Sequence, residues 1–400
     1  MHTSYIKKSD RLGRYFTSER VGQLLIESMQ NVSPSLVLDL GAGDGALTAA
    51  ASKQWLNAHF MTVDIDLAAQ SKLLHLQAKE RFTHTTADAL RHDLPNLLNL
   101  SLGSTDAAIC NPPYLHPKWN NDFSSILKEA GLDDVMFSRK DVSAELIFIA
   151  QNLRFLKNSG VLGLILPDGI ISGEKYIGLR RKLLDEHAVE SIIELPRRIF
   201  RRTDAKTHIL VLKKNGTSND KLTLQKVDEN CNFMRPLIIS MTHAHERLDY
   251  SFHANFFHEK NGIQIRNVAS KLIRGRTASS QRKFKPYPVF HTTDMKCGDL
   301  NIPQEFLLSK ELCLPDEVIA TEGDILLSRV GRNLSDKICI VRKGNVAVSD
   351  CIFVLRVRKE YRNKLLSYLL SNEGKTYLNA LSHGVGAKFL TQNAILSLTF

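Results

Sequence analysis

The stretch that decides the fold lies at residues 36–45 and reads LVLDLGAGDG. Its first half is apolar enough to form a buried strand, and the glycines that follow let the backbone turn and approach a ligand closely. A helix is predicted from Ala46 to about Gln54, and its first N–H groups would face that turn. A strand, a glycine turn and a helix in this order predict the opening of a nucleotide-binding α/β sheet.

The glycine spacing differs from the usual dinucleotide fingerprint, and Asp39 stands two residues before the first glycine. A carboxylate at this position repels a pyrophosphate but attracts an ammonium group. The turn therefore favours a cofactor with an amine and a carboxylate but no phosphate, of which S-adenosylmethionine is the common example. On the turn alone, an ordinary α/β crossover without a ligand stays open as the alternative.

Two more acids follow the next two predicted strands. Residues 60–66 read FMTVDID and predict the second strand, and Asp64 at its tip is placed to accept hydrogen bonds from ribose hydroxyls. Asp88 falls where the third strand should end and could accept from an adenine amino group. Each acid alone is more often a solvated turn residue. Three acids at successive strand ends predict a nucleoside-binding edge of the sheet.

The apolar run at residues 107–110 is followed by Asn111-Pro112-Pro113-Tyr114. Proline supplies no N–H to a strand and restricts the residue before it, so this motif predicts a stiff turn at the carboxyl end of a strand. The Asn111 amide oxygen and the Pro112 carbonyl can hold both hydrogens of a planar amino group while Tyr114 stacks on the ring. The motif predicts methylation of an exocyclic amine, and a rigid turn with no chemistry is the alternative.

Strands and helices alternate through the rest of the first half. Strands are predicted at 160–167, 191–195 and 208–212, and helices at 19–29, 144–156 and 180–185. This alternation predicts an α/β fold with a doubly wound sheet. Residues 115–134 are polar and irregular, and we expect them to form a long loop over the site, with a disordered surface insertion as the alternative.

Composition limits the class of protein. The 400 residues carry a formal net charge of +11, with 27 basic against 24 acidic side chains in residues 1–215 and 26 against 18 in residues 216–400. The excess in the second half favours a polyanionic partner there, although solubility alone is the alternative. The six cysteines have neither C-x-x-C nor zinc-site spacing, and no apolar run has membrane-spanning length. We therefore expect a soluble, cytoplasmic protein without a metal or a membrane.

Taken in order, these motifs resemble the gamma-class adenine-N6 DNA methyltransferases, especially the modification subunits of type I restriction systems and single-chain enzymes with a C-terminal recognition domain. The matching residues are Phe16-Thr17, 39–43, 63–66, 87–88, 111–114 and Leu195 with Phe200. The resemblance covers residues 11–214 and implies a Rossmann-like, S-adenosylmethionine-dependent methyltransferase domain.

The resemblance implies roles for the cofactor residues. Thr17 and the turn that contains Asp39, Gly41 and Gly43 would hold the methionine part of S-adenosylmethionine. Asp64 would bind the ribose and Asp88 the adenine amino group. Asp64 departs from the family pattern, in which glutamate is more usual.

The resemblance also implies roles at the target base. Asn111 and the Pro112 carbonyl would accept hydrogen bonds from the amino group of a flipped-out adenine. Tyr114 would stack on one face of that base and Phe200 on the other. For Phe200, a core position beside a strand is the alternative.

The domain boundaries follow from this match. We expect a methyltransferase domain at residues 1–215, a transition at 216–246 and a smaller α+β domain at 247–400. The last part resembles one target-recognition domain of a type I specificity subunit, chiefly through GDILLS at 323–328 and the predicted helix pair 361–370 and 373–381.

The whole pattern implies a site-specific adenine-N6 DNA methyltransferase of a restriction-modification or phage-defence system. Its partners would be double-stranded DNA and a restriction endonuclease subunit. The alternatives are methyl transfer to RNA bases or protein glutamine, and a catalytically silent DNA-binding relic.

Overall fold

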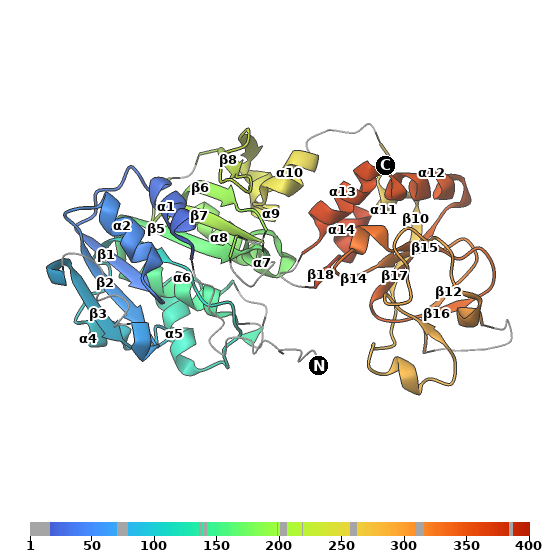
Figure 1. Cartoon of the computed structure of the whole chain (residues 1–400), viewed down its shortest axis with the longest axis horizontal. Helices are drawn as coiled ribbons and strands as arrows, with labels where there is room; N and C mark the ends of the chain where they lie inside the picture. The colour runs from blue at the N-terminus through green and yellow to red at the C-terminus, as the bar shows by residue number, and fades with distance from the viewer. Residues whose placement is uncertain are drawn as a thin grey trace, which may run out of the picture. The chain divides into compact units, whose positions relative to one another are not determined.

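The computed structural model describes residues 17–69, 79–135, 138–139, 142–197, 199–200, 206–217, 219–256, 262–308, 316–383 and 387–400. The chain forms two compact units, Met1–Tyr250 and Ser251–Phe400 (Figure 1). Phe16 of the predicted motif lies outside the described residues. Within the described ranges, no helix combines the length and the apolar character that a membrane crossing requires.

A nine-stranded sheet forms the centre of the described part of the first unit, in the order β3-β2-β1-β4-β5-β7-β6-β8-β9 (Figure 1). In chain order the strands are β1 (Leu36–Leu40), β2 (His59–Asp64), β3 (Phe82–Thr86), β4 (Thr105–Cys110), β5 (Leu156–Pro167), β6 (Ala188–Glu194), β7 (Thr207–Lys213), β8 (Lys221–Lys226) and β9 (Leu237–Ser240). Strands β3, β2, β1, β4 and β5 are parallel, and β7 lies antiparallel between β5 and β6. The chain order reverses between β1 and β4, the place where open α/β sheets bind ligands.

Helices cover both faces of this sheet. Helices α1 (Glu19–Glu27) and α2 (Ala46–Gln54) share a core cluster with Val37 of β1 and Ile109 of β4. Helix α6 (Ala144–Phe155) packs against β1, β4 and β5, and none of its residues belongs to that cluster. The other helices of this unit are α4 (Leu94–Leu98), α5 (Asn121–Glu129), α7 (Asp168–Ser172), α8 (Ile177–Glu186) and α9 (Met241–Glu246). The predicted doubly wound α/β sheet is confirmed.

The loop predicted at residues 115–134 is wrong in part, because it contains helix α5. Asn120 caps this helix by accepting a hydrogen bond from the Phe123 N–H at 3.1 Å. Phe123, Ile126 and Leu127 are buried, and the helix packs against α6. Their i, i+3, i+4 spacing is the pattern of an amphipathic helix, but polar residues on the outer face hid it in the sequence.

The segment expected as a transition, residues 216–246, contributes strands to the sheet. Strand β8 pairs in parallel with β6, and β9 pairs antiparallel with β8. Leu222 and Leu224 alternate with exposed residues along β8, as in a strand with one buried face. The first unit therefore extends to Tyr250, beyond the expected boundary at residue 215.

The second unit is an α+β structure around a four-stranded antiparallel sheet in the order β10-β17-β13-β15. Its strands are β10 (Ala269–Arg274), β11 (Val289–Phe290), β12 (Ile319–Ala320), β13 (Ile325–Ser328), β14 (Val330–Gly331), β15 (Ile338–Ile340), β16 (Val346–Val348), β17 (Ile352–Val357) and β18 (Lys388–Phe389). Its helices are α11 (Ile265–Val268), α12 (Lys359–Leu370), α13 (Asn372–Leu381) and α14 (Gln392–Leu396), while α10 (Tyr250–Phe256) spans the boundary between the units.

Alternating side chains of the central strands bury both faces of that sheet. Ile325 and Leu327 belong to the core cluster shared with helices α12 and α13, whereas Leu326 belongs to a second cluster with Cys339 and Val354. Each face of the sheet therefore packs against its own layer. The predicted helix pair at 361–370 and 373–381 corresponds to α12 and α13.

Candidate active site

A cavity of about 180 Å³ lies at the carboxyl ends of β1, β2 and β4. Parallel strands end at the same edge of a sheet, so residues that follow different strands meet there. Of the residues predicted from the sequence, the cavity is lined by Thr17, Asp39, Gly41, Gly43, Asp64, Asp88 and Asn111. The structure thus gathers the predicted cofactor residues and the predicted amide in one place.

Asp39 is buried at 1 % exposure and has an incomplete set of hydrogen-bond partners. Its Oδ2 accepts from the Thr48 hydroxyl at 2.5 Å, while Oδ1 is buried with no hydrogen-bond partner among the described residues. Burial raises the pKa of this carboxyl to about 7, and the hydrogen bond from Thr48 only partly opposes the shift. An unpartnered buried carboxylate oxygen gains most from a cationic ligand in the cavity.

The glycine turn after β1 forms one wall of the cavity. Gly41 and Gly43 have φ angles of 76° and 58°, a left-handed conformation that favours glycine. A Cβ atom on Gly41 would lie 3.2 Å from the Phe148 ring, whereas one on Gly43 would meet nothing within 4 Å. Gly43 therefore faces open space, and a ligand can approach its backbone closely.

The other two acids are oriented by backbone N–H groups. Asp64 accepts from the N–H of Gly43 at 2.7 Å through Oδ2 and from the N–H of Asp66 at 2.8 Å through Oδ1. Asp88 accepts from the N–H of Leu90 at 2.9 Å. Each carboxylate oxygen has more than one lone pair, so both side chains keep acceptor capacity for a ligand while their orientation is set by the main chain.

Asn111 follows β4 and is held by residues on both sides of its amide. Its Nδ2 donates to the Thr17 hydroxyl at 2.9 Å, and its Oδ1 accepts from the Tyr114 hydroxyl at 3.4 Å. The contact with Thr17 joins residues 94 positions apart and was not expected from the sequence. With Nδ2 bonded to Thr17, the amide oxygen of Asn111 is the atom that can accept a hydrogen bond from a ligand.

Several apolar side chains that line the cavity were missed by the sequence analysis. They are Ile65, Leu90, Leu115 and Phe148. Ile65 directly follows Asp64 and is 52 % exposed, which is unusual for a large aliphatic residue next to a strand end. An apolar residue beside each predicted ligand-binding acid was the sequence signal that could have identified Ile65 and Leu90.

Three of the predicted residues do not line the cavity. Pro112 is buried and Tyr114 is half-buried beside Asn111, so both adjoin the site. Phe200 is 2 % exposed and belongs to the core cluster that also contains Val21 and Leu195. The structure therefore does not bring Phe200 to the predicted target site, because a phenyl ring beside a strand end buries more apolar area in that core.

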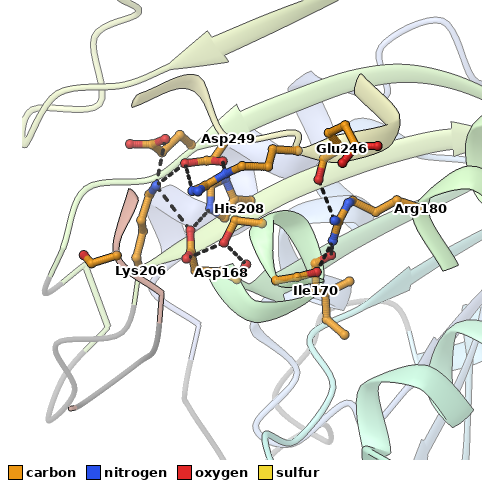
Figure 2. Close-up of polar contacts among 12 residues, drawn as sticks. Asp168, Ile170, Arg180, Lys206, His208, Glu246 and Asp249 are labelled. Carbon is orange, nitrogen blue, oxygen red and sulfur yellow. Dashed lines mark hydrogen bonds and ion pairs between the residues drawn. The ribbon is translucent and has the colours of Figure 1, made fainter. Parts of the chain in front are cut away.

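A buried cluster of charges lies farther along the same sheet edge, at the ends of β5, β6 and β7 (Figure 2). The Lys206 ammonium lies 3.2 Å from Asp168, 3.1 Å from Glu194 and 3.2 Å from Asp249. His208 contacts Asp168 at 3.0 Å. No motif in the sequence points to this charge cluster.

The charges of the cluster compensate one another. Burial by itself would lower the pKa of the Lys206 ammonium, but the three carboxylates around it raise that pKa above its ordinary value. Burial by itself would raise the pKa of Asp168, but the charge of Lys206 and the hydrogen bond from His208 hold it well below its usual range. Arg247 likewise lowers the pKa of Asp249, to which it donates at 2.7 and 2.9 Å.

Arg180 connects this region to the last helix of the unit. Its guanidinium is 1 % exposed and donates to the carbonyls of Ile170, Gly173 and Glu246 at 3.0, 2.8 and 2.6 Å (Figure 2). Burial lowers the pKa of this guanidinium to about 10. These contacts attach the end of α9, and with it the segment that leads to Tyr250, to helix α7 at the sheet edge.

Comparison with known proteins agrees with this geometry. The family model described as N-6 DNA Methylase matches residues 3–236. The methylase subunit of the type I restriction enzyme MpnII from Mycoplasma pneumoniae is 24 % identical over 239 residues, which cover 56 % of this chain and 44 % of that protein. The type II methyltransferase M.BsuBI from Bacillus subtilis is 22 % identical over 205 residues, which cover 46 % of this chain and 39 % of that protein.

A solved structure resembles a larger part of the chain. The type IIG restriction endonuclease BpuSI has a TM-score of 0.52 at 16 % identity, covering 96 % of this chain and 58 % of that one. The chain spans less than half the length of the two curated relatives described above. Because the family model covers more than half of the sequence and includes every residue of the cavity, the chain belongs to the N-6 DNA methylase family.

Proposed function

We propose that the chain is a site-specific DNA methyltransferase that transfers a methyl group from S-adenosylmethionine to the N6 amino group of adenine, as part of a restriction-modification system. The observation that carries this proposal is the position of Asn111. Asn111 lines the same cavity as Asp64 and Asp88, whose carboxylates are oriented by backbone N–H groups, and as Asp39, whose Oδ1 has no hydrogen-bond partner among the described residues.

The residues of the cavity fit S-adenosylmethionine. The buried Oδ1 of Asp39 would accept from the cofactor's ammonium group, and the open backbone at Gly43 leaves room for its carboxylate. Asp64 would accept from the ribose hydroxyls and Asp88 from the adenine amino group. When bound, S-adenosylmethionine supplies a methyl group on a positively charged sulfur.

Asn111 and the Pro112 carbonyl would act on the target amine. The lone pair of an adenine amino group is delocalised into the ring, so the amine is a weak nucleophile. Two acceptors that take both N–H bonds favour a pyramidal nitrogen and stabilise the positive charge that develops there during transfer. The hydrogen bond from Asn111 Nδ2 to Thr17 keeps the amide oxygen in the acceptor position.

Tyr114 would stack on the target base. An adenine inside a duplex is paired, so it has to leave the stack, at a cost of about a few kcal/mol. An aromatic ring adjoining the acceptor amide would recover part of that cost by stacking. The hydroxyl of Tyr114 also donates to Asn111, so the ring and the amide oxygen are held together.

Duplex DNA and a restriction subunit are the partners that we propose. The second half of the chain carries most of the basic excess, which suits a polyanion. The second unit, residues 251–400, would then serve as the target-recognition domain. The relatives named as a type I restriction methylase subunit and a type II methyltransferase support a place in a restriction-modification system.

Incubation with labelled S-adenosylmethionine tests this function. Unmethylated bacterial DNA, RNA and a glutamine-containing peptide are offered separately, and the products are separated by nucleoside or peptide chromatography. We expect label in N6-methyladenine from DNA only. Label in RNA or in the peptide would show that DNA is not the substrate. DNA binding that changes neither with the cofactor nor with Asn111→Ala would identify a catalytically silent DNA-binding protein.

A further inference from the structure

A basic turn in the second unit presents an aromatic side chain to solvent. Residues 271–287 contain six lysines and arginines and no aspartate or glutamate. Within this segment Phe284 is 86 % exposed, more than any other large hydrophobic residue in the described part of the chain. Leaving a phenyl ring in water costs about 2 kcal/mol relative to burying it, so an exposed ring is a candidate contact for a ligand or partner that covers it.

The backbone that carries Phe284 is held by hydrogen bonds on both sides of the ring. Residues Arg282–Phe284 form a turn of 3₁₀ helix, in which the N–H of Phe284 donates to the Gln281 carbonyl at 3.0 Å. Before the ring, Arg282 donates to Asp294 at 2.6 Å and to Thr293 at 3.1 Å.

The residues after the ring are held as firmly. Glu317 accepts from the Lys285 ammonium at 2.5 Å and from the Tyr287 hydroxyl at 2.9 Å. It also accepts from the Thr277 hydroxyl at 2.7 and 2.6 Å, which joins the two ends of the basic segment. The turn is therefore anchored on both sides of Phe284 and directs the ring outward.

The cations of the segment fall into two groups. Arg274 pairs with Asp350, while Arg282 and Lys285 form the anchoring ion pairs. The remaining cations of the segment are exposed and have no ion-pair partner among the described residues; they are Lys271, Arg276 and Lys283. Half of the charge of the segment is thus used to shape it, and half is available to a ligand.

We propose that the turn at residues 281–287 is a DNA-contacting element of the second unit. Phe284 inserts against the bases of duplex DNA, while Lys283 and Arg276 contact phosphates. Proteins that deform DNA use such apolar wedges between base steps, flanked by phosphate-binding cations. The inference rests on the proposed function, because it takes duplex DNA as the substrate of this chain.

The surroundings of the ring favour nucleic acid over a protein partner. Phe284 is the one exposed large hydrophobic residue between residues 271 and 288, and its sequence neighbours Lys283 and Lys285 are cationic. Stable protein interfaces place their aromatic anchors in a larger apolar centre and exclude lysine from it. A single aromatic ring among unpaired cations instead complements a base step between two phosphate backbones.

Steady-state methyl transfer by the full chain tests the inference, with labelled S-adenosylmethionine and unmethylated bacterial DNA. Phe284→Ala should raise the KM for DNA roughly tenfold, the loss expected when one base contact is removed. Phe284→Trp should restore it, because the larger ring still stacks. Phe233→Ala removes a ring that is 51 % exposed in the first unit and serves as the matched control with an unchanged KM.

The salt dependence of DNA binding tests whether the cations contact phosphates. Lys283→Ala should reduce the slope of log affinity against log salt by about 1, whereas Phe284→Ala should leave that slope unchanged. Each variant should keep the thermal unfolding temperature and the cofactor affinity of the original chain. A Phe284→Ala variant with unchanged KM on DNA would overturn the inference while the proposed function stands. Absence of methyl transfer to DNA by the original chain would overturn both.

Discussion

Asp39 and Asp168 are both buried carboxylates at the carboxyl edge of one sheet, yet burial changes their pKa in opposite directions. Asp39 lines the cavity and keeps one oxygen without a hydrogen-bond partner in the described part of the chain, and burial raises its pKa to about 7. Asp168 is 3 % exposed, and Lys206 and His208 overcome the effect of burial and hold its pKa well below the ordinary range.

The difference lies in where the compensating charge comes from. In the charge cluster, lysine and arginine side chains of the chain itself surround the carboxylates. At the cavity, the Thr48 hydroxyl is the side-chain partner of Asp39 among the described residues, and Asp39 lines a space that a ligand can fill. Loss of one member of a buried charge network destabilises a structure because it leaves an unpaired charge, whereas a carboxyl with a strongly shifted pKa in a cavity is typical of a functional site.

The largest expected effect is on the reaction, from Asn111→Ala. Loss of an acceptor that stabilises developing charge should lower kcat by about 10³-fold. Because Asn111 is proposed to contact the target amine, the affinity for S-adenosylmethionine should stay within about tenfold. Single-turnover methylation and calorimetric titration measure the two quantities. Full activity in this variant would remove the proposed mechanism.

The charge cluster is tested by Lys206→Met, which removes the cation shared by three buried carboxylates. Breaking a buried ion pair on one side leaves uncompensated charge, so the free energy of unfolding should fall by about 3–5 kcal/mol. Denaturant titration measures this free energy of unfolding. Lys182→Met is the matched control, because Lys182 forms exposed ion pairs with Asp134 and Glu186, and its loss should lower the free energy of unfolding far less. Equal losses in the two variants would mean that the cluster adds little stability.

The two carboxylates should also respond to pH in opposite directions. Folded Asp39 binds a proton up to about pH 7, while its unfolded form releases it above 3.8. The folded state therefore binds more protons in that window, and the free energy of unfolding should fall as pH rises through it. Between pH 5 and pH 8 the original chain should lose roughly 2 kcal/mol relative to Asp39→Asn.

Asp168 has the reverse dependence, because its pKa is lowered on folding. Its contribution is present above the unfolded value of 3.8 and is lost as the pH falls through the lower folded value. Denaturant titrations across both pH ranges separate the two groups. If Asp39→Asn did not change the slope between pH 5 and pH 8, the proton would belong to another residue.

The cavity was largely predictable from the sequence because most of its polar residues lie at or just after the carboxyl end of a strand. Asp64 and Asp88 were recognisable as strand-end acids, and the motif at Asn111 stood out through its prolines. Parallel pairing then brings these local features together without further information. The fold and most of the polar residues that line the cavity could therefore be predicted from short segments.

The charge cluster was not predictable because its members have no local signature. Glu194, Lys206 and Asp249 come from separate elements, and each resembles an ordinary charged residue in the sequence. Their pairing depends on an antiparallel strand, β7, inserted between β5 and β6. Phe200 differs in the opposite way. The resemblance implies a role at the target base, whereas the structure buries this residue in the core.

The smallest expected effect comes from Thr17→Val, which tests whether Thr17 binds the cofactor, as the resemblance implies, or orients Asn111, as the structure indicates. The resemblance assigns Thr17 to the methionine part of the cofactor, whereas its hydroxyl accepts from Asn111 Nδ2 at 2.9 Å. Removing that hydroxyl deletes a hydrogen bond worth about 1 kcal/mol that orients the amide, so kcat should fall roughly fivefold. The affinity for S-adenosylmethionine should stay unchanged, and Thr17→Ser should retain full kcat. A weaker cofactor affinity with unchanged kcat would instead assign Thr17 to the cofactor, and Asn111 would then need another group to orient its amide.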